Sequence, residues 1–310
     1  MVNITESTYS SYLTYNGNFA NFEYYTLSGN TVSVLPAWIE SNNSGKLITW
    51  VKLPKGIPAK SNTIIYLGFA STSNNLLSSS GTTGIGEAPQ LPCGSIATSS
   101  CSTYAEYDDG ASVFNFYSDF KGNTLNTNKW IESATGTISI IINNGITLSQ
   151  AGSTEGYIYS TSTFGTNTIL EFYGKNYQVS SSGSNYCANY FGYSNPTVNT
   201  GFSVLYTTEF TPCGYINPTQ SLANSNPTGT SYNLITPNTN TNIWGLAYNG
   251  TGTHLYSDYT QLTTLNSYEA YYPLPLSFIE QAESGWTFYV QFTRVRAYPP
   301  NGIMPSAAFG

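Results

Sequence analysis

Residues 137–149, TISIIINNGITLS, consist of two short apolar runs joined at Asn144-Gly145. Asn-Gly is the pair that best accommodates positive φ angles at both central positions of a two-residue β-turn. The β-branched isoleucines and threonines on either side favour extended backbone, because a helix restricts their χ1 rotamers. This stretch therefore predicts an antiparallel β-hairpin, and it indicates the type of secondary structure to expect around it.

Similar short runs continue on both sides of the hairpin, from Val113 to Tyr298. Polar, glycine-containing turns separate them at intervals of about 8–20 residues, a spacing typical of β-sandwiches and jelly rolls. SFIEQAESG (277–285) is the one short helix candidate in this region. The predicted strands lie in FNFYSDF (114–120), LNTNKW (125–130), GYIYSTSTF (156–164), NTILEFYGKNY (167–177), GFSVLYTTEF (201–210), NIWGLAYNGTGTHLYSDY (242–259) and GWTFYVQFTRVRAY (285–298).

The composition agrees with a fold built from strands. Hydrophobic residues make up 40% of the 310 positions and charged residues only 8%, while tyrosine occurs 27 times. Tyrosine and threonine fit a pleated, half-buried surface, whereas the strong helix formers are scarce. The net charge is −7 and the nine basic residues do not cluster, which argues against a nucleic-acid partner. A surface of neutral hydroxyls and amides changes little as carboxylates protonate, which suits an acidic exterior.

The four cysteines predict two disulfides, Cys93–Cys101 and Cys187–Cys213. Four cysteines allow three pairings, and this one joins the partners that are nearest in sequence. Neither spacing is C-x-x-C, and the single histidine cannot complete a Cys/His zinc set. Disulfides persist in oxidising surroundings, so the cysteine usage indicates an extracellular protein.

The chain has no apolar run of the roughly 18–20 residues that a membrane-spanning helix requires. Its first residues, MVNITESTYS, lack the basic start and the apolar stretch of a signal peptide. Because the cysteine usage is that of a secreted protein, we expect a mature chain or a portion of a longer precursor. The N-x-S/T sequons predict glycosylation at Asn3, Asn42 and Asn249.

The N-terminal region has strand signals of its own. LITWVKL (47–53) alternates between two faces, and NTIIYLGFA (62–70) is apolar on both faces. The Ser-, Gly- and Asn-rich stretch that follows, STSNNLLSSSGTTGIG (71–86), favours a linker. We expect a small β-sandwich domain at 1–80, a linker with a disulfide loop at 81–110, a jelly roll at 111–298 and an exit linker at 299–310.

Three blocks resemble known surface proteins. LPAWIESNNSGKLITWVKLP (35–54) together with NTIIYLGFA resembles an uncharacterised domain of prokaryotic surface proteins. VFNFYSDFKGNTLNTNKW (113–130) resembles the opening of a concanavalin A-like lectin/glucanase jelly roll, and WTFYVQFTRVRAYPPNGIMPSAAFG (286–310) is similar to its closing strand and tail in archaeal surface proteins. The resemblance implies an all-β fold, with a small N-terminal β-sandwich followed by a concanavalin A-like jelly roll. It also implies an exterior location, and it implies no activity.

The start of the chain, MVNITESTYSSYL (1–13), departs from this resemblance. It enters the first domain after the usual opening strand of that family. We therefore expect the missing strand to come either from a segment outside this sequence or from a neighbouring molecule by strand addition.

Catalytic signatures are sparse. Glycoside hydrolysis requires two carboxylates that flank the scissile bond, and the E-x-D-x-x-E signature of hydrolases with this fold does not occur. The nearest substitutes are Glu280 with Glu283, expected as solvated carboxylates in a turn or short helix, and the acidic group at residues 106–109. The lone histidine, His254, has no Gly-x-Ser-x-Gly elbow to serve. The sequence thus favours a protein that is not an enzyme, with a glycosidase as the weaker alternative.

Calcium is the one cofactor that the sequence suggests. Glu106, Asp108, Asp109 and Asp119 lie close together in sequence around a glycine-containing turn, and calcium binds clustered oxygen ligands. Their spacing matches no defined calcium loop, and the alternative is an acidic turn whose carboxylates accept hydrogen bonds from nearby backbone amides.

Aromatic residues and two arginines are the candidates for glycan binding. Tyr157 and Tyr159 fall on one side of a predicted strand, and Trp244 and Trp286 begin two others. In the closing strand, Arg294 and Arg296 share a face with an apolar row unless a bulge intervenes. Two arginines on that face would require carboxylate partners. Either a bulge turns them outward, or they hydrogen-bond in a groove; the alternative for the aromatics is sandwich core. The candidate glycan-binding residues are Tyr157, Tyr159, Trp244, Trp286, Arg294 and Arg296.

The sequence as a whole favours a non-enzymatic structural or attachment protein of a cell, filament or virion surface. Its neutral, aromatic-rich strands suit association with itself or with other surface proteins through sheet faces. The alternative from another class is a carbohydrate-binding, lectin-like module.

Overall fold

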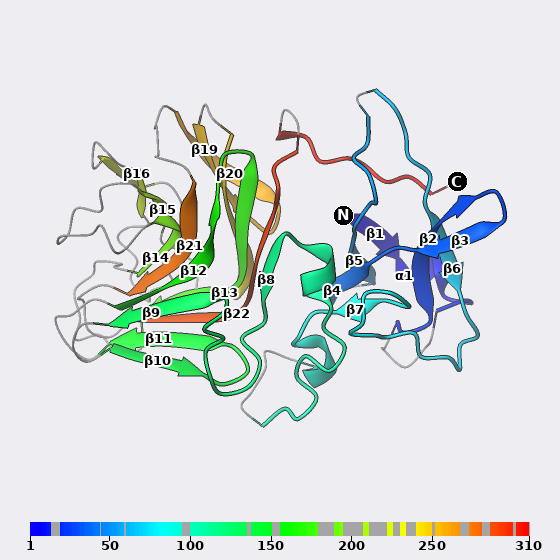
Figure 1. Ribbon diagram of the computed structural model, residues 1–310, viewed down its shortest axis with the longest axis horizontal. Coiled ribbons are helices and arrows are strands. Elements are labelled where there is room, and N and C mark those ends of the chain that lie inside the picture. The colour runs from blue at the N-terminus through cyan, green and yellow to red at the C-terminus, as the bar shows by residue number, and fades with distance from the viewer. Residues whose placement is uncertain are drawn as a thin grey trace. The chain divides into compact units, whose positions relative to one another are not determined.

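The computed structural model (Figure 1) divides the chain into two units, Met1–Tyr117 with Pro299–Gly310, and Ser118–Tyr298. Both units are built almost entirely from strands, which confirms the predicted all-β fold class. The structure describes residues 1–13, 19–43, 45–58, 60–94, 100–134, 138–150, 156–178, 189–194, 207–210, 222–225, 230–233, 240–249, 252–266, 273–280, 286–299 and 302–309.

The first unit contains two small sheets that enclose one apolar core. The first sheet has the order β1-β5-β4-β7 and the second has the order β3-β2-β6. Side chains that alternate along these strands, among them Ile4, Leu47 and Phe22, are buried between the sheets. The elements are β1 (Val2–Thr5), α1 (Glu6–Tyr9), β2 (Phe22–Ser28), β3 (Thr31–Val34), β4 (Ala37–Asn43), β5 (Lys46–Val51), β6 (Tyr66–Phe69), β7 (Gly86–Glu87), η1 (Leu91–Cys93) and α2 (Gly110–Val113).

The opening strand of this unit is formed by the chain itself. Val2–Thr5 pairs antiparallel with β5, with Val2 opposite Thr49 and Ile4 opposite Leu47. Its alternating burial places Val2 and Ile4 in the core. Val2–Thr5 is thus a strand that the chain itself contributes, at the edge of the β1-β5-β4-β7 sheet.

The segment predicted as a linker at 81–110 is part of the first unit. β7 pairs parallel with β4, and the Ala88 amide donates to the Ile39 carbonyl oxygen. The Trp38 indole N–H donates to Asp108 at 2.8 Å, which ties the end of this segment to β4. The boundary between the units thus falls after Tyr117 rather than after residue 110. The expected exit linker also belongs to the first unit, where the ring of Phe309 lies 5.6 Å from that of Tyr9.

The second unit is a sandwich of two antiparallel sheets. One sheet has the order β10-β11-β22-β13-β18-β19-β20 and the other has the order β17-β16-β15-β14-β21-β12-β9. β8 (Phe116–Ser118) lies where the chain passes from the first unit to the second. The strands are β9 (Trp130–Ala134), β10 (Ile138–Ile142), β11 (Ile146–Gln150), β12 (Gly156–Phe164), β13 (Thr168–Gln178), β14 (Asn189–Ser194), β15 (Thr207–Phe210), β16 (Leu222–Ser225), β17 (Thr230–Asn233), β18 (Asn242–Tyr248), β19 (Gly252–Ser257), β20 (Thr260–Asn266), β21 (Leu274–Glu280) and β22 (Trp286–Ala297).

The chain crosses repeatedly from one sheet of the sandwich to the other, so that β11, β13 and β22 belong to one sheet and β12, β14 and β21 to the other. This alternation gives the jelly-roll architecture that the sequence predicted. Phenylalanine rings fill the space between the sheets: Phe278 of β21 contacts Phe172 at 5.7 Å and Phe288 at 5.3 Å between ring centroids. Burial of these rings supplies the main apolar driving force for the sandwich.

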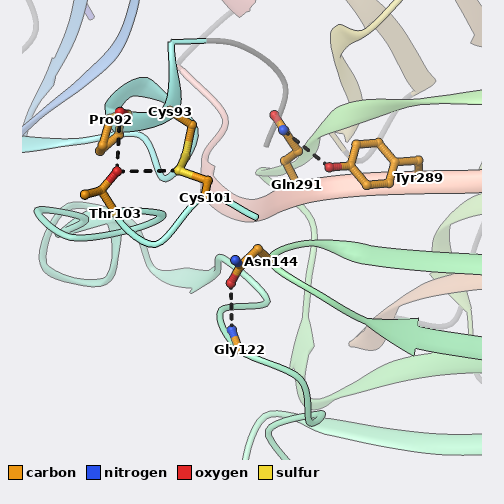
Figure 2. The surroundings of a disulfide bond; sticks show 8 residues. All are labelled: Pro92, Cys93, Cys101, Thr103, Gly122, Asn144, Tyr289 and Gln291. Atoms are coloured by element: carbon orange, nitrogen blue, oxygen red, sulfur yellow. Dashed lines mark hydrogen bonds between the residues drawn. A yellow bond between two sulfur atoms is a disulfide. The ribbon is translucent and has the colours of Figure 1, made fainter. Parts of the chain in front are cut away.

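The predicted hairpin at 137–149 is confirmed as β10 and β11, with Ile142 opposite Ile146. Asn144 and Gly145 have φ angles of 53° and 123°, as this turn requires. The side-chain oxygen of Asn144 also accepts a hydrogen bond from the Gly122 amide at 3.2 Å (Figure 2). In contrast, the helix candidate at 277–285 is wrong in its described part, because residues up to Glu280 belong to β21.

The Cys93–Cys101 disulfide is confirmed, with a Cα–Cα distance of 5.8 Å (Figure 2). The predicted Cys187–Cys213 pair lies outside the described residues. In the part of the chain that the structure describes, no helix is both long enough and apolar enough to cross a membrane.

Candidate functional site

A bulge in the closing strand decides where its two arginines lie. Along β22, Phe292 is opposite Tyr173 and Val290 is opposite Gly174, so Gln291 is an extra residue at which the register shifts. Because an extra residue reverses the alternation of side chains, Arg294 lies on the opposite face of the sheet from Val290. The structure contains the bulge of the first predicted arrangement, and the arginines that it turns are also hydrogen-bonded and largely buried, as in the second.

The bulge is built from particular residues. A Cβ atom at Gly174 would collide with the carbonyl oxygen of Tyr289, so glycine lets β13 approach the bulged strand closely. The Gln291 side-chain amide donates to the Tyr289 hydroxyl at 3.4 Å (Figure 2). Gly174 thus allows the close approach of the two strands at the bulge, and the hydrogen bond joins two residues of the bulged strand.

Both arginines bind one carboxylate on the outer face of the β13–β22 pair. Arg294 Nε donates to Glu171 Oε2 at 2.7 Å, and Arg296 Nη2 donates to Glu171 Oε1 at 2.7 Å. The side chain of Arg294 is fully buried, and that of Arg296 is 11% exposed. Burial alone would raise the pKa of Glu171, but the charges and hydrogen bonds of Arg296 and Arg294 outweigh it and hold the pKa below its usual value. The carboxylate is therefore ionised and paired.

Aromatic groups surround this ion cluster. Arg294 Nη2 donates to the Tyr259 hydroxyl at 2.8 Å, and its guanidinium lies 5.7 Å from the centre of the Phe292 ring. The ring of Tyr298 stacks 5.8 Å from that of His254. Burial lowers the pKa of His254, which favours the neutral form of this imidazole on β19.

The predicted tyrosine pair lies on the outer face of the other sheet. Tyr157 and Tyr159 of β12 are opposite Ile279 and Ser277 of β21, and their rings lie 6.2 Å apart at an angle of 46°. Both side chains are half-buried, and burial raises the pKa of the Tyr159 hydroxyl. The exposed side chain of Ile131, on β9, is opposite Tyr159 and extends this surface.

Trp244, another predicted aromatic ligand, does not join this surface. Trp244 is 2% exposed and lies on the sandwich-facing side of β18, opposite Phe172, so its ring is core and cannot stack on a sugar. The backbone of Trp286 begins β22, but its side chain lies outside the described part of the structure.

Glu280 is not the solvated turn residue that the sequence predicted. It ends β21, a strand in which every residue is buried, and its side chain is completely enclosed. A substrate could not reach this carboxyl group in the present structure. Glu283, its proposed partner, lies outside the described residues.

In the acidic turn that suggested calcium, hydrogen-bond donors of the protein contact the carboxylate of Asp108. This carboxylate accepts hydrogen bonds from the Trp38 indole, from the Tyr117 hydroxyl at 2.6 Å and from the Gly110 amide at 3.0 Å. Asp109 accepts from the Ser112 hydroxyl, and Asp119 accepts from the Lys121 amide at 3.2 Å. Within the described residues, no group of three or more His, Cys, Asp or Glu side chains is arranged to hold a metal ion.

An apolar sheet face in the first unit was missed at the sequence level. On the outer side of the β3-β2-β6 sheet, Leu27 is 46% exposed, Val32 57% and Tyr66 39%. Tyr25 stacks on Tyr66 at 5.4 Å, and Gly68 leaves room for the Tyr25 ring. We call this surface the apolar outer face and define it by Tyr25, Leu27, Val32, Val34 and Tyr66. The signal that could have revealed it is the presence of apolar residues on both faces of YYTL (24–27), together with the valines at alternate positions of TVSV (31–34).

Three comparisons place the chain among known proteins. No protein-family model matches it. A stretch of 144 residues, 44% of the chain, is 31% identical to uncharacterized protein 562 of Sulfolobus islandicus rod-shaped virus 1, and it covers 22% of that protein. The chain therefore matches less than a quarter of the length of this curated relative.

Solved structures with a similar arrangement of strands are described as glycanases or related proteins. A beta-1,3-glucanase from Mycobacterium marinum is 13% identical, with 59% of this chain and 98% of that one covered and a TM-score of 0.43. A pseudo beta-1,3-glucanase of Mycobacterium tuberculosis is also 13% identical, with coverages of 59% and 98% and a TM-score of 0.42. An endo-acting O-glycanase structure from human gut microbiota is 11% identical, with coverages of 59% and 99% and a TM-score of 0.45. Likeness at this level says nothing about activity or ligand.

Proposed function

We propose that the chain is a non-enzymatic extracellular structural protein that self-associates through the apolar outer face of its first unit. The observation that carries the proposal is this face itself, where Leu27, Val32 and Tyr66 are exposed side by side on neighbouring strands. Contiguous exposed apolar surface on a sheet marks an interaction site, because an isolated protein gains free energy by covering it. Its occupant is a second copy of the same chain.

The geometry of the sheet favours association between copies. β3 and β6 are the edge strands of the β3-β2-β6 sheet, so the apolar outer face is bordered by strand edges that can pair with another chain. With only 8% charged residues in the sequence, two such faces meet with little electrostatic repulsion. Glu23, at one end of the same side of the sheet, accepts a hydrogen bond from the Gly84 amide at 3.2 Å.

Two carboxylates that the sequence offered for catalysis are engaged or enclosed, which supports a non-enzymatic role. Asp108 accepts hydrogen bonds from Trp38, Gly110 and Tyr117, and the side chain of Glu280 is fully buried. The disulfide between Cys93 and Cys101 supports an oxidising, exterior location. The viral relative supports a virion surface as that location.

Analytical ultracentrifugation over a concentration series tests the proposed self-association. Wild-type chain is expected to form dimers or larger species as its concentration rises, and Leu27→Glu and Val32→Glu are each expected to weaken association at least tenfold. Ile141→Glu is the matched control, because Ile141 is an equally exposed isoleucine on β10 of the other unit. A wild-type chain that stays monomeric up to about 1 mM would refute the proposal, since even an interface worth about 4 kcal/mol populates dimers there. Equal loss of association in the Ile141 variant would also count against it.

Carbohydrate binding is the second candidate, and the Tyr157–Tyr159 pair favours it. Two half-buried tyrosines with Ile131 beside them offer rigid, amphipathic rings to the face of a sugar. A glycan array distinguishes the candidates: binding that is lost in Tyr157→Ala and Tyr159→Ala but kept in Tyr12→Ala would support a lectin. Tyr12 is a suitable control because it is an exposed tyrosine of the first unit. If the wild-type chain binds no glycan, this second candidate is rejected.

A further inference from the structure

The strongest unexplained feature of the jelly-roll unit is the side chain of Glu280. It lies at the end of β21, between Gly156 of β12 and Asn189 of β14. Its alternation along the strand puts it on the same side as Leu276 and Phe278, which face the other sheet. The side chain is 0% exposed, and among the described residues neither carboxyl oxygen has a hydrogen-bond partner.

No charged side chain in the described part of the unit compensates this carboxyl group. On β12, Tyr157 and Tyr159 lie on the outer side of the sheet, opposite Ile279 and Ser277. On β14, Tyr193 is opposite Leu276 and its hydroxyl donates to the Thr168 carbonyl oxygen at 2.8 Å.

The described side chains that the facing sheet turns toward β21 carry no charge. The sandwich-facing residues of β11 are Ile146 and Leu148, and those of β13 and β22 include Phe172 and Phe288. The charged residues of β13, Glu171 and Lys175, alternate with Phe172 and so belong to the outer face. Glu132, two strands away on β9, is exposed.

A charged carboxylate without partners in such a place would be strongly unfavourable. The group avoids this penalty by keeping its proton, and burial accordingly raises the pKa of Glu280 well above its usual value. Desolvation is the cause of this shift, which agrees with the lack of a charged neighbour among the side chains that the structure describes.

We propose that Glu280 is a pH-sensitive element of the jelly-roll unit, neutral and enclosed between the sheets in acid, whose ionisation at higher pH opens the end of β21. This inference is independent of the proposed self-association. It rests on the enclosed, partnerless carboxyl and on its place at a strand end, where local opening can bring it to water without dismantling the whole sheet.

The direction of the effect follows from proton linkage. A carboxyl whose pKa is raised by folding binds its proton more tightly in the folded than in the unfolded chain. Its contribution to stability is fully present below the unfolded pKa of about 4.3 and is lost as the pH rises through the folded pKa. Over that window the equilibrium constant for unfolding rises by up to tenfold per pH unit.

Urea denaturation of the full chain between pH 4.5 and 9 tests the proposal, with wild type compared with Glu280→Gln. Glutamine keeps the size of the side chain but cannot ionise, so the ratio of the wild-type to the variant unfolding constant is expected to climb by up to tenfold per pH unit. Other titrating groups are common to both proteins and cancel in the ratio. Glu132→Gln is the matched control on the same sheet, and its ratio is expected to stay flat. A Glu280 ratio that changes by less than twofold over the whole range would overturn the proposal.

Hydrogen exchange measured by mass spectrometry provides a second readout that does not depend on a folded variant. In wild-type chain, a peptide containing Leu274–Glu280 is expected to open more often as the pH rises, after correction for the intrinsic exchange rate. A peptide from β10 and β11, residues 138–150, serves as the internal reference. Corrected opening of the β21 peptide that is constant with pH, or that only follows the reference peptide, would refute a local role for Glu280.

Discussion

Replacing Glu171 by Gln is the most direct test of the ion cluster on β13 and β22. Glutamine has nearly the same shape as glutamate, so the change removes the negative charge and leaves the packing in place. In the wild-type structure, the two guanidinium groups of Arg294 and Arg296 lie 2.7 Å from the carboxylate oxygens, and Arg294 is fully buried. The variant therefore leaves both cations without the charge that Glu171 supplies.

The expected loss is large. Removing one partner of a buried ion pair costs about 3–5 kcal/mol, chiefly because the remaining charge stays desolvated. Each hydrogen bond to a charged group contributes about 1.5–3 kcal/mol, and Glu171 accepts from Arg294 Nε and from Arg296 Nε and Nη2. Part of this remains in the variant, because the amide oxygen of glutamine still accepts hydrogen bonds. We therefore expect Glu171→Gln to lower the free energy of unfolding of the second unit by about 3–5 kcal/mol.

Urea denaturation at pH 7, followed by circular dichroism, measures this loss. Glu132→Gln is the control, because Glu132 is exposed on β9 and its replacement should change stability by less than about 0.5 kcal/mol. Replacing all three cluster residues with methionine should recover much of the loss, since a well-packed apolar cluster needs no counter-charge. If the free energy of unfolding of Glu171→Gln is within about 1 kcal/mol of the wild-type value, the ion cluster does not hold these strands together.

Three further predictions concern other parts of the fold. Glu87→Gln should flatten the pH dependence of the stability of the first unit. Burial, followed by repulsion from two nearby acids, raises the pKa of Glu87 to about 7, so the wild type loses about 3 kcal/mol of stability between pH 4.5 and 8. Urea midpoints at both pH values would show this loss. Cys93→Ser should lower stability by about 2–3 kcal/mol, the loop-closure entropy of a disulfide spanning eight positions, and reductant should lower the melting temperature of the wild type but not of the variant. Gly174→Ala should lower the free energy of unfolding by about 1–3 kcal/mol, because the added methyl group would collide with the Tyr289 carbonyl oxygen. Gly165→Ala is the control: its Cβ position is surrounded by open space, so the melting temperature should stay nearly unchanged.

The part of the fold that could be predicted from sequence is the part set by local chemistry. The Asn144-Gly145 turn requires positive φ angles that few other pairs tolerate, so the hairpin followed from two residues. The Cys93–Cys101 bond followed from short spacing. In both cases the decisive contacts join residues that are close in sequence.

For Arg294 and Arg296, the sequence left two possible arrangements and could not decide between them. Sequence alternation alone put Arg294 on the same side as Val290, and the bulge at Gln291 reversed this. Nothing in the residues around position 291 announces a bulge; the indication is Gly174, on a different strand that pairs with it only in the fold. The sequence also led us to expect a carboxylate partner for the arginines, but it could not identify Glu171, which lies far away along the chain.

The same limit explains the errors at the ends of predicted elements. SFIEQAESG carries good helix formers, but pairing with β12 and β14 draws Glu280 into a strand, because tertiary contacts outweigh weak local propensity. The Ser- and Gly-rich region after residue 70 resembled a linker, yet it contains the two residues of β7, which complete a sheet through parallel pairing with β4. A two-residue strand leaves no periodic pattern that sequence reasoning could detect.

The scarcity of charge gives the few buried acids an unusual influence on how stability depends on pH. In the second unit, the stabilisation from ionised Glu171 is present above the unfolded pKa of about 4.3 and is lost as the pH falls through its lowered folded pKa. Neutral Glu280 acts in the opposite direction, with full stability below that unfolded pKa and loss at higher pH. Since one acid weakens the sandwich in strong acid and the other weakens it towards alkaline pH, its free energy of unfolding should be greatest near pH 4–5. A profile of unfolding free energy against pH, measured for wild type, Glu171→Gln and Glu280→Gln, should show the acid limb flattened in the first variant and the alkaline limb flattened in the second. A wild-type maximum at pH 7 or above would show that these two buried groups do not govern the response.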